Sequence, residues 1–183
     1  VYKHYAGNHV QSVTLSHSYL NNRNIKYKNN DESDPDNLIL KLGSVEQETK
    51  LKMENTSSWD VWKVNAGVEL NYTNYTNNTF QQVYTDALKE FNYATDLNML
   101  RWGIYASADY SAPDESFTAS LGLRTDGNNY SDRMKELWRQ LSPRISVSYR
   151  LVDHLFLSGH MGLYYQLPAY TALGYKNNEG VYV

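Results

Sequence analysis

The sequence predicts an all-β protein, an antiparallel up-and-down meander of about seven strands. The first observation is that apolar and polar residues alternate with a period of two in several stretches, as side chains do on the two faces of a strand. The second is that long polar connections and short turns alternate along the chain. The third is the composition, with 17 tyrosines and four tryptophans but no cysteine in 183 residues. Together these observations favour a sheet with one apolar face and one polar face.

The clearest stretch is the hairpin within residues 141–174. In its first strand Ile145, Val147 and Leu151 fall on one face, and Ser146, Ser148 and Arg150 fall on the other. In its second strand Leu155, Leu157, Met161 and Leu163 are apolar, whereas His154, Ser158, His160 and Tyr164 face away. Each strand is about ten residues long, the length that crosses a bilayer when tilted. A soluble antiparallel sheet with one wet face gives the same alternation.

The first half of the chain holds three predicted strands, at about 9–20, 38–53 and 59–72. Residues up to Asn8 are polar, and residues 21–37 form an Asn- and Asp-rich loop. The first strand has the weakest pattern, because His17 shares a face with Val13 and Leu15. The third strand has a regular alternation. One face holds Trp62, Val64, Ala66, Val68 and Leu70, and the other holds Lys63, Asn65, Gly67 and Glu69.

Residues 73–97 are predicted to be the longest loop, with a short amphipathic helix inside it. Thr79 is placed as a possible N-cap. The apolar residues at helical spacing are Phe80, Val83, Tyr84, Ala87, Leu88 and Phe91.

Two more strands precede the hairpin, at about 98–110 and 117–124, joined by a tight turn around 112–114. A long loop at about 126–142 follows them, and the residues after Leu167 look like the start of another loop. Long loops thus follow strands one, three and five, and short turns follow strands two, four and six. That sorting is typical of an outer-membrane barrel, with periplasmic turns and extracellular loops.

The strand count favours an arc cut from a larger barrel. Seven is odd, whereas bacterial single-chain barrels are closed and even. An unpaired sheet edge cannot face lipid. A complete small barrel is excluded on this strand parity and on the lack of a final aromatic-ended strand.

The composition excludes several function classes. The net charge of -3 offers no basic footprint for nucleic acid. We expect no enzyme and no cofactor, because the chain has no cysteine and no serine in a Gly-x-Ser-x-Gly turn.

No metal site is predicted. His154 and His160 share a face but lie roughly 20 Å apart along a strand. The acidic run DESDPDN lacks the glycine and distal glutamate of a calcium loop. Five Asn-x-Ser/Thr sequons, at Asn55, Asn71, Asn74, Asn77 and Asn129, are what Asn- and Thr-rich loops produce by chance.

Three stretches resemble one family, the TonB-dependent outer-membrane receptors of Bacteroidota. They are NYATDLNMLRWGIYASADYS, SLGLRTDG and LSPRISVSYRLVDHLFLSGHMGLYYQLPAYTALGY. The resemblance is close over 92–175 and extends earlier only in strand and loop pattern. It implies a 22-stranded barrel in the bacterial outer membrane that encloses a plug domain. The TonB complex would pull on that plug to import a ligand. Residues 1–183 would then be a single partial β-barrel domain, without the plug, the TonB box and the C-terminal barrel strands.

The two faces of this arc carry the site predictions. Lipid should contact Trp62, Val64, Val68, Ile104, Leu121, Val147, Leu157 and Met161. The lumen-facing candidates are Lys63, Glu69, Arg101, Asp109, Arg124, Arg150 and His160. The ligand stays open between siderophore, cobalamin, glycan and peptide. The alternative is a soluble antiparallel β protein, such as a carbohydrate-binding module, which would have to bury its apolar face under a second layer.

Overall fold

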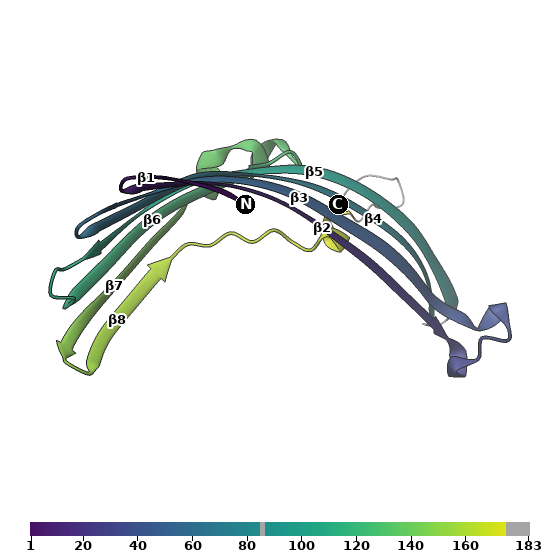
Figure 1. Cartoon of the computed structure of the whole chain (residues 1–183). Helices are drawn as coiled ribbons and strands as arrows, with labels where there is room; N and C mark the ends of the chain where they lie inside the picture. The colour runs from purple at the N-terminus through teal and green to yellow at the C-terminus, as the bar shows by residue number, and fades with distance from the viewer. Residues whose placement is uncertain (85–86, 175–183) are drawn as a thin grey trace. The chain divides into compact units, whose positions relative to one another are not determined.

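The computed structural model describes residues 1–84 and 87–174, which form one antiparallel sheet of eight strands. The strands lie side by side in sequence order, from β1 at one end to β8 at the other (Figure 1). Their bounds are β1 Tyr2–Ala6, β2 His9–Tyr27, β3 Leu38–Trp59, β4 Trp62–Tyr84, β5 Leu88–Ser111, β6 Phe117–Asn128, β7 Ser142–Val152 and β8 Leu155–Gly162. The predicted all-β meander is confirmed, and it is an open sheet in which β1 and β8 are end strands.

The sheet has one strand more than the about seven predicted, because β1 occupies residues expected to be irregular. β1 pairs with β2 from Tyr2 opposite Val13 to Ala6 opposite His9. The two-residue turn between them has Gly7 at φ +58, a left-handed conformation that glycine adopts without strain. With eight strands the parity argument no longer applies. The interpretation as an arc of a larger barrel rests instead on the open sheet, in which β1 and β8 are end strands.

The helix predicted inside residues 73–97 was also wrong. Thr79 and Phe80 lie in β4, whereas Leu88 and Phe91 lie in β5. The side chain of Gln82 donates a hydrogen bond to Glu90 across the two strands, at 3.1 Å. Residues 71–79 alternate strictly between buried and more exposed positions, and Asn, Thr and Tyr are poor helix formers. The period of two therefore overrides the few apolar residues at helical spacing.

The predicted sorting of the connections by length is confirmed for all connections except the one between β4 and β5. On one edge, two residues join β1 to β2, β3 to β4 and β7 to β8, and residues 112–116 join β5 to β6. On the other edge, the β2–β3 connection contains the 3₁₀ turns η1 Lys28–Asn30 and η2 Pro35–Asn37. The β6–β7 connection contains η3 Asp132–Lys135 and η4 Leu137–Gln140. The expectation that residues 73–97 form the longest loop was wrong, because β4 and β5, of 23 and 24 residues, take up most of this range and leave only three residues between them.

Two compact units divide the chain, and β2, β3, β4 and β5 each run through both. The first unit comprises residues 1–16, 50–71 and 100–166. Apart from the five-residue β1, its strand segments are roughly 8 to 12 residues long, about the length that spans a bilayer. The described part of the second unit comprises residues 17–49, 72–84, 87–99 and 167–174. It holds the remaining strand segments and the single helical turn α1, Tyr170–Leu173.

The buried core of the described residues is small and lies in the second unit. Its apolar members are Tyr75, Leu97, Met99 and Leu173. Thr73, Asn77, Thr79 and Thr95 of the same unit are also buried. In the first unit the apolar side chains of the sheet stay largely exposed. Among the described residues, no helix is long and apolar enough to cross a membrane.

Candidate functional site: the two faces of the sheet

The strand registers of the first unit place its apolar residues on one face. Ala108 pairs with Leu121, Leu121 with Ile145, and Ile145 with Met161. The large side chains on this face are 40 to 74 % exposed although all of them belong to strands: Met53, Trp62, Val68, Leu70, Leu100, Ile104, Leu121, Leu123, Ile145, Val147, Leu157 and Met161. An apolar band of this extent on a soluble monomer would be an aggregation site. It is the surface that a membrane would cover.

The opposite face of the first unit carries a charged network centred on Tyr105. Its hydroxyl donates a 2.5 Å hydrogen bond to Glu54, which also accepts from Lys52 at 2.7 Å. The Lys52 ammonium and the Arg124 guanidinium lie 5.4 and 5.7 Å from the centre of the Tyr105 ring. These distances are within the range of cation–π attraction. One tyrosine thus joins three strands.

Gly67 is the residue that lets Tyr105 reach across β4. A Cβ atom there would lie 2.8 Å from the Met53 carbonyl oxygen and closer still to the Tyr105 hydroxyl. Only glycine leaves room for the ring to pass over this strand and contact Glu54 on β3. The sequence signal for this crossing is a glycine on the polar face directly beside a large aromatic residue of the next strand.

Two of the predicted site residues, Glu69 and Arg124, extend this network. Arg124 lies 3.8 Å from Glu69 and 2.6 Å from Asp126, and Lys50 lies 3.6 Å from Glu69. Because these side chains are about a fifth to two fifths exposed, each ion pair contributes little on its own. Their collective effect is to fix a rigid pattern of charge on one face.

The other predicted residues lie on the same face as the network. His160 lines a cavity of about 380 Å³ with Arg124 and Arg144. The Arg144 guanidinium stacks 4.5 Å above the Tyr164 ring. Arg150 donates to the carbonyl of Asp114 at the edge with short turns, at 2.5 Å. The alternation of side chains along β4 and β5 places Lys63, Arg101 and Asp109 on this face. The Asp109 carboxylate accepts a hydrogen bond from the Ser120 hydroxyl at 2.5 Å. The sequence assigned all seven side chains to one face and missed the central role of Tyr105.

In the second unit, one face of β3, β4 and β5 carries polar side chains, and we call it the polar wall. Residues 170–174 of the chain pack against it. The Tyr170 hydroxyl of α1 donates to Glu48 at 2.5 Å, and its ring packs against Tyr75 with centroids 5.9 Å apart. Thr95 donates to the carbonyl of Gly174 at 2.6 Å. This burial raises the pKa of Tyr75 above its usual range. Sequence alone gave no sign that residues 170–174 would pack here.

The candidate metal and modification sites have structural roles. Asp31, in the acidic run, accepts from the backbone and hydroxyl of Ser33, and those bonds hold its pKa below the usual range. Within residues 1–84 and 87–174, no three His, Asp or Glu side chains gather as a metal site needs. In one of the sequons, the Asn74 side-chain amide donates a hydrogen bond of 2.8 Å to the side-chain oxygen of Asn98 on the neighbouring strand.

Residues 2–181 match the family described as TonB dependent receptor-like, β-barrel. The chain belongs to the β-barrel family of TonB-dependent receptors. The match extends over the first half of the chain, where the sequence resemblance had rested on strand and loop pattern alone. No curated protein and no solved structure matches the chain.

Membership fixes the coarse assignment of this TonB-dependent receptor barrel. The family consists of bacterial outer-membrane receptors that act in transport and are not enzymes. The all-β fold, the open meander of eight strands and the uncovered apolar band agree with part of such a barrel.

Proposed function

We propose that residues 1–183 are a single partial β-barrel domain of a TonB-dependent outer-membrane receptor, an importer of a scarce ligand. The observation that carries this proposal is the apolar band of the first unit. It extends across the six strands from β3 to β8, no described residue covers it, and its strand segments are about as long as a membrane crossing. A soluble carbohydrate-binding module would have to bury this face, and the described residues supply no second layer over it.

The direction of the strands in the membrane follows from their connections. The edge with short turns faces the periplasm, and the edge with η1 to η4 faces outward. β2, β3, β4 and β5 are 19 to 24 residues long and so exceed the length needed to cross lipid. Along the lipid-facing positions of β4, the unbroken run of apolar residues that starts at Trp62 ends at Leu70, and Tyr72 follows. A tyrosine at that boundary matches the aromatic girdle of membrane barrels.

The polar face of the first unit would line the lumen. There the lumen-facing residues Lys63, Glu69, Arg101, Arg124, Arg150 and His160 would contact water or the receptor's own plug domain. The ion pairs that Arg124 forms with Glu69 and Asp126 support a plug contact, because a fixed pattern of both signs can select a complementary surface. TonB would act on the plug from the periplasmic side and supply the energy for import.

The imported ligand belongs to one of the classes such receptors serve: siderophore, cobalamin, glycan or peptide. The motifs NYATDLNMLRWGIYASADYS and SLGLRTDG support a receptor of the Bacteroidota type. Partners of the chain are thus outer-membrane lipid, the plug, TonB and the ligand.

Cysteine labelling of the full-length receptor in outer-membrane vesicles tests this placement. Cysteines at Val147 and Leu157 should resist a water-soluble maleimide, because lipid would cover both positions. Cysteines at Ser148 and His160, on the opposite face of the same two strands, should react once the lumen is accessible. Equal reaction at all four positions would overturn the membrane placement.

A further inference from the structure

The cavity of about 380 Å³ on the polar face of the first unit has a floor of small residues. All of its lining residues belong to that unit, from β4 to the residues just after β8. In the strand register Gly122 lies between Ser107 on β5 and Arg144 on β7. In the next row on this face Ser120 pairs with Ser146. A Cβ atom on Gly122 would meet no atom of a neighbouring strand closer than 3.8 Å, so the floor is open above this glycine. The volume lies within the range of small-molecule sites, roughly 300 to 1,000 Å³.

Arg144 is held at the rim of this cavity by an aromatic ring. Its neighbours in the strand register are Gly122 on β6 and Gly162 on β8. Tyr164 folds back over Gly162, where a Cβ atom would lie 3.0 to 3.1 Å from the nearest Tyr164 atoms. The Arg144 guanidinium lies over this ring, 4.5 Å from its centre. A guanidinium held over a ring is fixed in position and keeps N–H donors for a second partner.

No carboxylate in the described part of the chain pairs with Arg144. The cavity has no acidic lining residue, and Arg124 at its rim is already paired with Glu69 and Asp126. His160 adds a ring nitrogen from β8, and both Arg144 and His160 are exposed. Carboxylate and phosphate groups match the donors of a guanidinium in a bidentate geometry. This rim is therefore suited to an anion.

Asn65 on β4 supplies an acceptor at the other end of the cavity. Its side-chain oxygen is buried and, within the described residues, accepts no hydrogen bond. A buried carbonyl oxygen without a donor is unfavourable, so a bound hydroxyl group that donates to it gains free energy. Because β4 and β7 are three strands apart, the backbones of Asn65 and Arg144 lie roughly 14 Å apart across the sheet, at about 4.8 Å per strand. The two side chains match a molecule with an anion at one end and a hydroxyl group at the other.

A sugar acid fits this arrangement better than a bare anion or a protein carboxylate. Inorganic phosphate, or an aspartate or glutamate side chain, brings an anion to Arg144 but no hydroxyl group to Asn65. A sugar acid carries both on opposite sides of one ring. The serine hydroxyls of Ser107 and Ser146, on the floor between them, can pair with its other hydroxyl groups.

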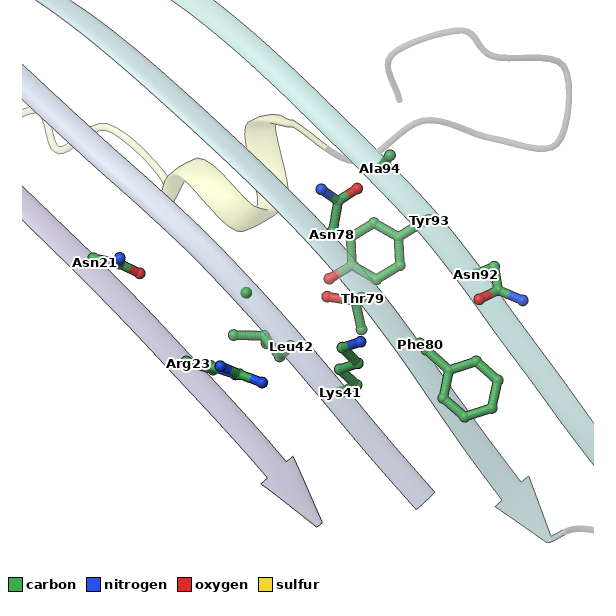
Figure 2. Close-up of a pocket in the computed structure, with 11 residues that line it drawn as sticks. Asn21, Arg23, Lys41, Leu42, Asn78, Thr79, Phe80, Asn92, Tyr93 and Ala94 are labelled. Carbon is green, nitrogen blue, oxygen red and sulfur yellow. The ribbon is translucent and has the colours of Figure 1, made fainter. Parts of the chain in front are cut away.

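The second unit has a cavity of its own, of about 540 Å³, that lacks these features (Figure 2). Its cations Arg23 and Lys41 come from β2 and β3. Among the described residues, neither cation lies over an aromatic ring, and no lining residue has a buried side-chain atom without a hydrogen-bond partner. Arg23 is therefore a matched control for Arg144.

We propose that the cavity at Arg144 binds a sugar acid, such as a uronic acid residue, of the imported ligand. Arg144 and His160 bind the carboxylate, and Asn65 accepts a hydrogen bond from a hydroxyl group on the far side of the ring. This assignment names an acidic saccharide as the substrate class and rests on the import function proposed above. The labelling of Val147 and Leu157 tests the membrane placement separately.

Equilibrium dialysis of radiolabelled D-glucuronate against the full-length receptor in detergent tests the site. Arg144→Gln should bind about 10-fold to 100-fold more weakly than the parent, because it loses hydrogen bonds to a charged group. Gly122→Val should weaken binding about fivefold or more by filling the floor without changing the charge. Arg23→Gln removes the same charge from the other cavity and should bind like the parent.

Three results of this dialysis would overturn the proposal. They are equal affinity of Arg144→Gln and the parent, an equal loss in Arg23→Gln, and equal affinity of the parent for D-glucuronate and D-glucose. The second result would show a general attraction to positive charge, and the third would show that the carboxylate is not recognised. Heat-modifiable migration on a gel checks the folding of each variant.

Modification of arginine by phenylglyoxal, located by mass spectrometry, identifies the source of the carboxylate without any substitution. In the full-length receptor Arg144 should react, and D-glucuronate but not D-glucose should protect it. Arg124, which is already paired, should react slowly with or without the acid. If Arg144 is protected before any acid is added, a carboxylate of the receptor itself, such as one from the plug, occupies the site and the ligand assignment is overturned.

Discussion

Replacing Val147 by arginine tests whether this position faces lipid or water, because only in lipid should the substitution strongly lower the free energy of unfolding. Val147 is the sixth of the eleven residues of β7 and is 44 % exposed. Its strand neighbours are Ala119 and Gly159, and a Cβ atom at Gly159 would meet nothing within 4 Å. An arginine side chain therefore has room at position 147, and steric overlap contributes nothing to the expected effect.

The expected loss of stability comes from the solvent on that face. An arginine on the lipid face near the midplane costs roughly 2 to 4 kcal/mol. This cost corresponds to a change of roughly 30-fold to 900-fold in the folding equilibrium. Ser148 is the matched control on the opposite face. Its hydroxyl shares an exposed hydrogen bond of 2.8 Å with Ser158, so Ser148→Arg should cost no more than about 1 kcal/mol.

Urea titration of the full-length receptor folded into lipid vesicles measures both variants against the parent. The free energy of unfolding should fall for Val147→Arg by at least 1 kcal/mol more than for Ser148→Arg. Equal losses, or a larger loss for Ser148→Arg, would refute the assignment of the apolar band to lipid.

Three further outcomes are expected from the contacts of single residues. Gly67→Ala should lower the free energy of unfolding by about 1 to 3 kcal/mol through overpacking, whereas Gly159→Ala, with open space at its Cβ position, should be near neutral in urea titration. Tyr170→Phe removes the hydrogen bond to Glu48 and should speed amide exchange in residues 72–99; unchanged exchange would show that α1 does not hold this wall. Bonds from Ser116 lower the pKa of Asp114 below its unfolded value, so they stabilise the β5–β6 turn above about pH 4 and this stabilisation is lost as the pH falls. Asp114→Asn should abolish that acid dependence in turn amide exchange.

The sequence by itself determined which side chains share a face. The alternation of Val147 with Ser148, and of Leu70 with Glu69, is a local property of an extended backbone, since successive side chains point to opposite faces whatever lies around them. The meander order followed in the same way, because short turns allow only neighbouring strands to pair antiparallel. The family resemblance rested on these patterns.

Only the tertiary structure decided how far each strand continues and what crosses between strands. β4 continues to Tyr84 and β5 begins at Leu88 because the backbone groups of each strand are hydrogen-bonded to the other. Polar residues such as Asn77 lie in this part of β4, so no alternation of apolar residues predicted the strand there. The short β1 exists because β2 offers a partner of the right register. Tyr105 reaches Glu54, and Tyr170 reaches Glu48, across 51 and 122 residues of sequence. Contacts at such separations depend on how strands are placed in space, which no local pattern contains.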